Sequence, residues 1–141
     1  MSAHDPYASY NFLVEVSGIT AAGFAEVSGL EVEIESIEYR EGNSPTTGVR
    51  KFPGLAKFAN IVLKRGVAGA ELWEWMQNIL DGNIDRRSGS IILLNQARDE
   101  VARWNFFEGW PCKWEGPSLS ATKSGIAFET VEICHERLLR A

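Results

Sequence analysis

The segment LEVEIESIEYR, residues 30–40, has the clearest strand pattern in the sequence. Its first half alternates apolar residues with the carboxylates Glu31, Glu33 and Glu35. Because successive side chains of a strand point to opposite faces, this alternation predicts a strand with one apolar face and one acidic face. A run of charges is usually a solvated strand face. On the inner wall of a closed channel, the same carboxylates would set the electrostatics of the channel.

The second half of this segment changes phase. Ile37 and Tyr39 continue the apolar set one residue out of step with the first half. The change predicts a β-bulge near Ser36, which would restore the register and carry Glu38 and Arg40 onto the polar face.

A polar loop and a return strand follow. We predict a loop over residues 41–54, EGNSPTTGVRKFPG, which is too long for a tight hairpin. Loops of this length without structure are uncommon in small domains unless they have a function. In the return strand the apolar face comes from Ala59, Ile61 and Leu63, with Asn60 and Lys64 on the opposite face.

The composition describes one domain over residues 1–141. With 45% hydrophobic residues and five tryptophans, the chain can close a core without a disulfide or a metal. The net charge of -5 argues against nucleic-acid binding, which needs clustered Lys and Arg. The first residues do not resemble a signal peptide, and the longest apolar run is residues 91–94, so we expect synthesis in the cytoplasm and no membrane insertion. Cys112 and Cys134 are expected to be reduced, buried thiols, although they could pair.

The remaining pattern predicts six or seven strands and one helix. Residues 1–8 are expected to be flexible, and the strands are placed at residues 10–16, 19–27, 90–95, 100–107, 110–115 and 126–135, besides those above. The whole span 20–39 could be one bent element. Pro111 lacks an amide donor, so its strand should begin there or lie at an edge.

A helix is predicted over residues 70–81. Its apolar positions follow the i, i+3, i+4, i+7, i+8 spacing of an amphipathic helix, and they are Leu72, Trp75, Met76, Ile79 and Leu80. Trp73 lies off this stripe, either exposed for a partner or packed over its own domain. The resulting fold class is mainly β: an antiparallel β-sandwich or barrel-like domain with one flanking helix and a long inter-strand loop.

Signals for catalysis are absent from the pattern. Gly42 and Gly48 bracket a loop, but the Lys and Ser/Thr of a phosphate-binding loop do not follow. No zinc spacing and no nucleophile elbow occur in the sequence. His135 and Glu129 lie about 20 Å apart along one strand, so they cannot act as joint ligands. We therefore expect no enzyme, no metal and no cofactor, with His135 as a hydrogen-bonded structural residue.

Several motifs, in order, resemble one known family. In the C-terminal half these are RWNF at 103–106, WPCKWEGP at 110–117, IAFET at 126–130 and HE at 135–136. In the N-terminal half they are VSGL at 27–30, IEYREG at 37–42, PG at 53–54 and LW at 72–73. Over residues 10–138 the chain resembles the tail tube proteins of contractile-tailed phages and of phage-derived contractile injection systems. Residues 74–76 depart from the Asp-Trp-His common in that family.

The resemblance implies a structural protein that forms hexameric rings, which stack into a rigid hollow tube inside a contractile sheath. Its partners would be further copies of itself, the sheath protein, baseplate or hub proteins, and a cargo of protein effector or DNA in the lumen. The particle would be a phage tail or a phage-like injection particle, virion or extracellular. Candidates for contacts between rings are Arg40, Asn43, Ser44, Pro45, Thr46, Arg50 and Lys51. Candidates for the lumen are Glu31, Glu33, Glu35, Asn60 and Lys64.

A different class of protein fits some of the same features. A monomeric ligand-binding or enzymatic β-barrel could use the helix as a lid and line a pocket with Trp110, Cys112 and Trp114. The pattern also leaves open whether the particle is a phage tail, an extracellular injection system or a membrane-anchored one.

Overall fold

The structure is a computed structural model that describes residues 11–17, 19–40, 42, 48–66, 70–116 and 129–141. The predicted flexible residues 1–8 lie outside this part of the chain. The described residues form nine strands and one helix: β1 (Asn11–Val16), β2 (Ile19–Ser28), β3 (Val32–Tyr39), β4 (Arg50–Phe58), β5 (Ile61–Gly66), α1 (Ala70–Leu80), β6 (Arg87–Leu94), β7 (Glu100–Glu115), β8 (Glu129–Cys134) and β9 (Arg137–Arg140).

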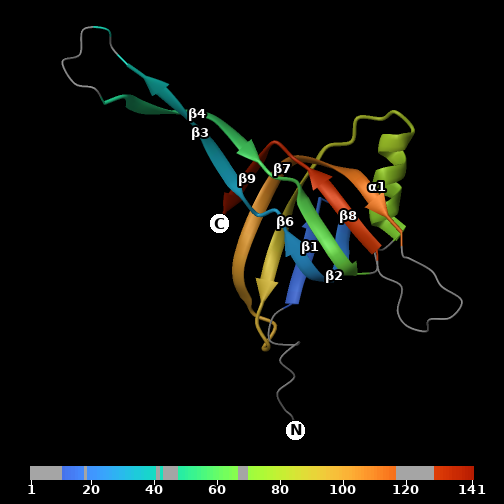
Figure 1. The fold of residues 1–141 in the computed structure, drawn as a ribbon. Helices are drawn as coiled ribbons and strands as arrows, with labels where there is room; N and C mark the ends of the chain where they lie inside the picture. Colours follow the sequence, from blue (N-terminus) through green and yellow to red (C-terminus); the bar gives the residue numbers. More distant parts are fainter. Residues whose placement is uncertain (1–10, 18, 41, 43–47, 67–69, 117–128) are drawn as a thin grey trace, which may run out of the picture.

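Seven of these strands form one antiparallel sheet that closes on itself. Its order is β6-β1-β2-β5-β8-β7-β9, and a further pairing of β6 with β7 closes it into a barrel (Figure 1). β3 and β4 pair only with each other and project from the barrel as a two-stranded ribbon. The predicted fold class, mainly β with one helix and an antiparallel barrel-like sheet, is confirmed.

Strand β7 closes the barrel because it pairs with both β6 and β8. Its first ten residues pair with β6, and the segment from Trp110 to Glu115 pairs with β8. The two separate strands predicted at 100–107 and 110–115 are therefore one strand, and Pro111 is in its interior rather than at its start. The register shifts between Pro111 and Lys113, which leaves Cys112 as the extra residue of a bulge. A bulge is a position where a strand tolerates a proline.

The boundary between β2 and β3 also differs from expectation. The span 20–39 is two elements because Gly29 takes a positive φ of 87° between them. A side chain strongly disfavours this left-handed conformation, which glycine adopts freely. The chain thereby leaves the barrel wall after β2 and enters the projecting ribbon.

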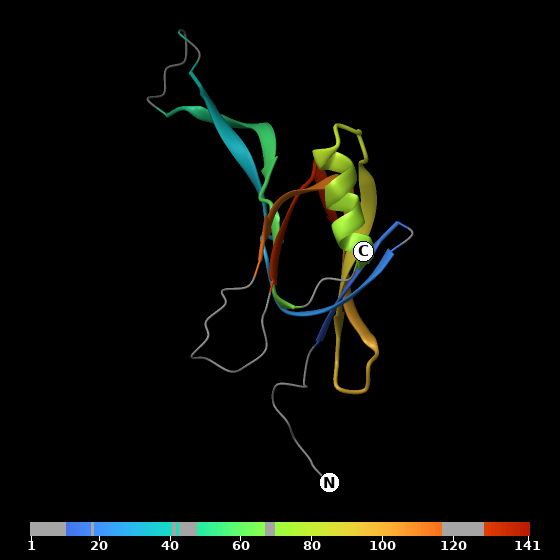
Figure 2. The ribbon, with the colours of Figure 1, turned by 90° about the vertical axis from the view of Figure 1, so that its right-hand side faces the viewer.

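The barrel interior is filled by apolar side chains from both halves of the sheet and from α1. The fully buried members include Val14, Ile61, Leu63, Leu72, Trp75, Ile91, Phe106, Val131 and Ile133. Figure 2 shows α1 packed against the barrel, where it contacts β7 and β2. No helix in the described ranges is long and apolar enough to cross a bilayer.

Trp75 anchors the helix to the barrel. Its Nε1 donates a hydrogen bond to the Asp85 carbonyl oxygen at 2.7 Å, and the Arg87 guanidinium lies 5.4 Å from the centre of its ring. Arg87 also makes two 2.9 Å contacts with the Asp85 carboxylate, and this hydrogen bonding lowers the pKa of Asp85 below its ordinary value. Leu80 was predicted to be on the buried stripe but is 60% exposed, because α1 ends there and the chain turns away through Gly82.

Candidate assembly surface

The two-stranded ribbon of β3 and β4, which we call the arm, is the most unusual surface of the molecule. It runs from the pair Val32 and Phe58 next to the barrel to the pair Tyr39 and Arg50 at its far end. The predicted loop at 41–54 was therefore too long, because residues 50–54 belong to β4. Pro53 and Gly54 suggested a turn, yet Pro53 pairs with Ser36 beside a register shift, where a proline is tolerated.

The bulge in the arm has the predicted position but is on the other strand. Ile34 pairs with Ala56 and Ser36 with Pro53, so two steps along β3 match three steps along β4. The extra residue is thus in β4, at Gly54 and Leu55. Because the extra residue is not in β3, the side chains of β3 keep alternating between its two faces along the whole strand. The prediction that Glu38 joins the face of Glu33 and Glu35 was therefore wrong. Those two carboxylates share their face with Ile37 and Tyr39 instead.

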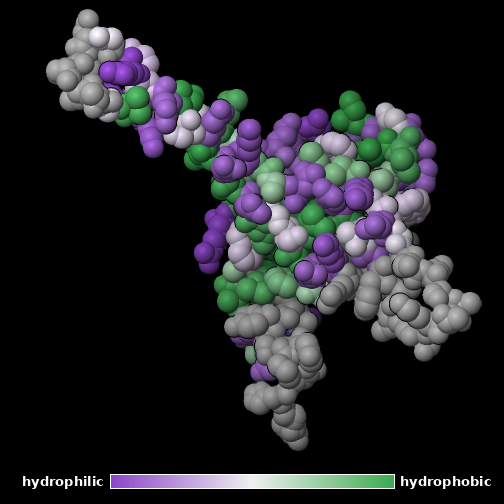
Figure 3. Space-filling model, viewed as in Figure 1, coloured by the Kyte–Doolittle hydropathy of each residue, from purple (hydrophilic) through white to green (hydrophobic). Residues whose placement is uncertain are grey.

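Both faces of the arm therefore expose apolar side chains to solvent. Leu55 is 73% exposed, Ile34 is 58% exposed, and four further members, Val32, Ile37, Tyr39 and Phe52, are exposed as well. Tyr39 and Phe52 contact each other edge to face, with ring centres 6.3 Å apart. An isolated two-stranded ribbon is only marginally stable in water. A group of six exposed apolar side chains on one ribbon indicates an interaction site. Figure 3 shows apolar and polar groups mixed along the whole arm.

The arm carries charges of both signs along its length, including Glu38 opposite Lys51 at its far end. The cations Arg40, Arg50 and Lys51 lie at the far end, and all three are exposed. No carboxylate of the described residues forms an ion pair with them, and Arg50 instead stacks 5.5 Å from the centre of the Phe52 ring. The other predicted residues for ring contacts, 43–46, lie outside the described part of the chain.

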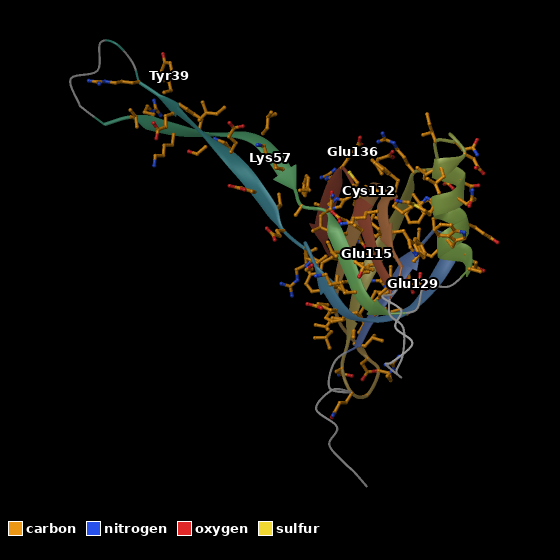
Figure 4. The ribbon with its side chains drawn as sticks, turned by 45° about the vertical axis from the view of Figure 1, so that its right-hand side comes forward. Tyr39, Lys57, Cys112, Glu115, Glu129 and Glu136 are labelled. Carbon is orange, nitrogen blue, oxygen red and sulfur yellow. The ribbon has the colours of Figure 1, made fainter. Side chains whose placement is uncertain are left out.

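The structure splits the predicted lumen residues into two groups. Glu31, Glu33 and Glu35 are on the arm or at its root and are exposed. Lys64 belongs to β5 in the barrel wall, where it lies beside Glu26 of the neighbouring strand, and Asn60 precedes β5 in the link from β4. Figure 4 shows this separation, with Tyr39 and Lys57 on the arm and Cys112, Glu115 and Glu129 on the barrel.

Asn60 belongs to a polar cluster on the outer face of the barrel. Its Nδ2 donates to the Glu132 carboxylate at 2.9 Å and approaches the Cys112 sulfur at 3.7 Å. Cys112 and Cys134 are free thiols, and both are half-buried rather than fully buried. Desolvation raises the pKa of the Cys112 thiol, and the nearby Glu132 carboxylate raises it further.

Within the described residues, Trp110, Cys112 and Trp114 do not line the concavity of the barrel. The bulge at Cys112 interrupts its alternation, and Trp114 packs against the core and donates to the Glu129 carboxylate at 2.7 Å. Trp73 contacts Trp114 edge to face at 5.0 Å, so its ring packs over its own domain while staying 43% exposed. That concavity, of about 290 Å³, lies between β1, β6 and the middle of β7, around Phe106. Within the described residues, no three side chains are grouped to hold a metal ion.

The root of the arm is held by contacts that sequence reasoning missed. The Ala59 amide donates to the Glu31 carbonyl at 3.4 Å, and the Ala59 carbonyl accepts a hydrogen bond from His135 at 2.9 Å. His135 is 93% buried, since its exposed fraction is 7%. The structural role predicted for His135 is thus consistent with its contacts. Its partner at the arm root could not be predicted from the local pattern.

Comparison with known proteins agrees with this architecture. The model of the T4-like virus tail tube protein gp19 family matches residues 8–139. The chain belongs to this family. No match is found among curated proteins.

Solved structures share the tail-tube fold over nearly the whole chain. A chain of the sheath-tube complex of an extracellular contractile injection system, PVC, in the extended state is 27% identical with a TM-score of 0.79, and the alignment covers 100% of this chain and 99% of that one. A chain of the anti-feeding prophage tube-terminating cap is 26% identical, with the same TM-score and coverage of 100% and 94%. Hcp1 from Flavobacterium johnsoniae, at 16% identity, TM-score 0.56 and coverage of 92% and 94%, shares the fold. The chain is a structural tail tube protein, and its family and fold neighbours are tube proteins rather than enzymes.

Proposed function

We propose that the chain forms six-membered rings that stack into a hollow tube, and that the arm of each subunit docks on a copy in the next ring. The observation that carries this proposal is the arm itself. It extends away from the barrel and exposes apolar side chains on both faces. Docking would remove this surface from water, and it would also cover the unpaired edges of a two-stranded ribbon.

Closed rings would limit growth to the direction of the tube axis. A head-to-tail contact between identical subunits forms a closed ring when the rotation from one subunit to the next is a whole-number fraction of 360°. Growth then continues only along the ring axis. The six-fold number is supported by the resemblance and by a related chain from the anti-feeding prophage baseplate, described as 6-fold symmetrised, which is 20% identical.

The outer partners follow from the relatives. The relatives are chains of a sheath-tube complex, a terminator cap and a baseplate, so the corresponding partners here would be a contractile sheath, a cap and baseplate or hub proteins. The chain would be made in the cytoplasm and assembled into a phage tail or a phage-like injection particle, virion or extracellular. The cargo in its lumen would be a protein effector or DNA, with protein favoured.

The lumen would be lined by the outer face of the barrel strands around β5, with Asn60 and Lys64 on its wall. Glu31, Glu33 and Glu35, at the arm and its root, would line the junction between rings. Their negative charge would keep an anionic cargo from adhering, over a range of about 8 Å at physiological salt.

Reversing charges at the far end of the arm tests the docking proposal. We expect Arg50→Glu combined with Lys51→Glu to leave the rings intact and to raise the protein concentration needed for stacking by about tenfold, because two attractions become repulsions. Stacking would be measured by sedimentation and negative-stain microscopy across salt concentrations, and the effect should shrink at high salt.

The matched control reverses two exposed cations of the barrel, Lys113→Glu with Arg137→Glu. This variant carries the same change in net charge without touching the arm. Two results would contradict a role of the arm cations in docking. One is stacking of the arm variant at the concentration that the wild type needs, and the other is an equal rise in that concentration for the barrel variant.

A further inference from the structure

One side chain connects the core of the barrel to the root of the arm. His135 follows the last residue of β8 at a corner of the chain, and its ring lies 5.8 Å from the ring of Phe58 and 6.3 Å from the ring of Phe106. Phe106 is fully buried in the core, whereas Phe58 is the last residue of the arm strand β4. The imidazole thus lies between the rigid interior and the base of the projecting ribbon.

Within the described part of the chain, the polar contact of this imidazole goes to the arm root. A carbonyl oxygen only accepts hydrogen bonds, so the 2.9 Å contact with Ala59 requires the proton to be on Nε2 of His135. The other ring nitrogen, Nδ1, is buried and has no partner among the described residues. Among the described residues, the hydrogen bond to Ala59 is therefore the polar interaction that orients the ring.

The corner that carries His135 is itself fixed to the barrel. The Glu136 amide donates to the Phe107 carbonyl of β7 at 3.1 Å, and the Glu136 carboxylate pairs with Arg86 at 2.8 Å. Ala59, in contrast, belongs to the two-residue link between β4 and β5. A fixed donor on the barrel therefore holds an acceptor in the segment about which the arm could pivot.

We propose that His135 is a positioning residue that fixes the direction of the arm relative to the barrel before assembly. The eight residues of β3 give the arm a length of about 26 Å at about 3.3 Å per residue. A rotation of about 10° at the root would move the far end by about 4 to 5 Å, which is enough to misplace Tyr39 and Phe52. An arm held in its docking direction loses less freedom on binding, so it binds more tightly. The link from arm direction to stacking rests on the proposed function; the anchoring itself does not.

Two variants at this position separate the hydrogen bond from the packing of the ring. His135→Phe keeps an aromatic ring but has no donor for the Ala59 carbonyl. His135→Gln lacks the ring but places an amide donor near the position of the imidazole Nε2. The direction of the arm would be measured by double electron–electron resonance between spin labels at Lys51 and Asp81, introduced through non-natural amino acids so that both native cysteines remain. Labelled chains would be diluted into unlabelled ones.

We expect a narrow distance distribution for the wild type and for His135→Gln, and a distribution at least about twice as wide for His135→Phe. Thermal unfolding of both variants would establish that the barrel is folded during the measurement. A distribution for His135→Phe as narrow as that of the wild type would overturn the proposal, and so would a distribution for His135→Gln as wide as that of the Phe variant.

Tube formation by the same two variants tests the connection to assembly separately. We expect His135→Phe to need up to about tenfold more protein to stack, in line with one lost neutral hydrogen bond, and His135→Gln to recover most of this loss. If the arm of His135→Phe is disordered in direction but its tubes form normally, His135 is still the anchor and the docking role of the arm is contradicted.

Discussion

Substituting Gly29 by alanine will destabilise the subunit by about 3 kcal/mol or more, enough to unfold a marginal domain. Two causes add at this position. Gly29 has a φ of 87°, and a Cβ built there would overlap the backbone carbonyl of Asn60. The carbonyl belongs to the link between β4 and β5, so it cannot move aside like the end of a flexible side chain. Urea unfolding followed by tryptophan fluorescence would measure the loss.

Gly82 provides the matched control for Gly29. It has nearly the same φ, 89°, but nothing lies within 4 Å of the position of its Cβ. Gly82→Ala should therefore lower the free energy of unfolding by only about 1 to 2 kcal/mol, the cost of placing a Cβ in the left-handed conformation. Equal destabilisation by the two substitutions would show that the close crossing at the arm root does not constrain the fold.

Removing the aromatic pair of the arm will abolish stacking while leaving the subunit folded. In the variant Tyr39→Ser with Phe52→Ser, two rings that are about half exposed in the single chain can no longer be buried against a neighbour. At about 2 kcal/mol for each ring, the affinity between rings should fall by about a thousandfold. Negative-stain microscopy and sedimentation would report rings without tubes, and the melting temperature should change little.

A control for this loss uses apolar residues that are even more exposed but lie outside the arm. Leu80 and Ile84 are 60% and 90% exposed, and Leu80→Ser with Ile84→Ser removes a comparable apolar surface. Tubes should form normally from this variant. Normal tubes from the arm variant, or loss of tubes from the control alone, would place the contact between rings elsewhere.

The sequence predicts most of the barrel because alternation and helical spacing report which side chains are buried. The helix begins at Ala70 as predicted and ends one residue earlier than predicted, and Val14, Ile61 and Leu63 face the core as expected. The structure also gives physical reasons for two of the motifs shared with the gp19 family. The VSGL motif contains Gly29 at the close crossing, and the HE motif contains His135, which contacts the same link.

What the pattern could not reveal is whether an apolar face is covered by its own chain or by another. Val32 and Ile34 alternate with carboxylates like the residues of any half-buried strand, yet they are exposed on the arm. The start of β4 was missed because Pro53 and Gly54 have the composition of a turn, and their tolerance in a strand depends on a bulge set by pairing with β3. The partner of His135 is 76 residues away in sequence, so no local signal connects the two.

The most direct test of the central claim, that the arm joins one ring to the next, is a cryo-electron microscopy reconstruction of the assembled protein at side-chain resolution. We predict stacked six-fold rings in which each arm lies on a subunit of the adjacent ring, with Tyr39 and Phe52 buried in that contact. Stacked rings in which the arms pack only within their own ring, or remain exposed to solvent, would contradict the account.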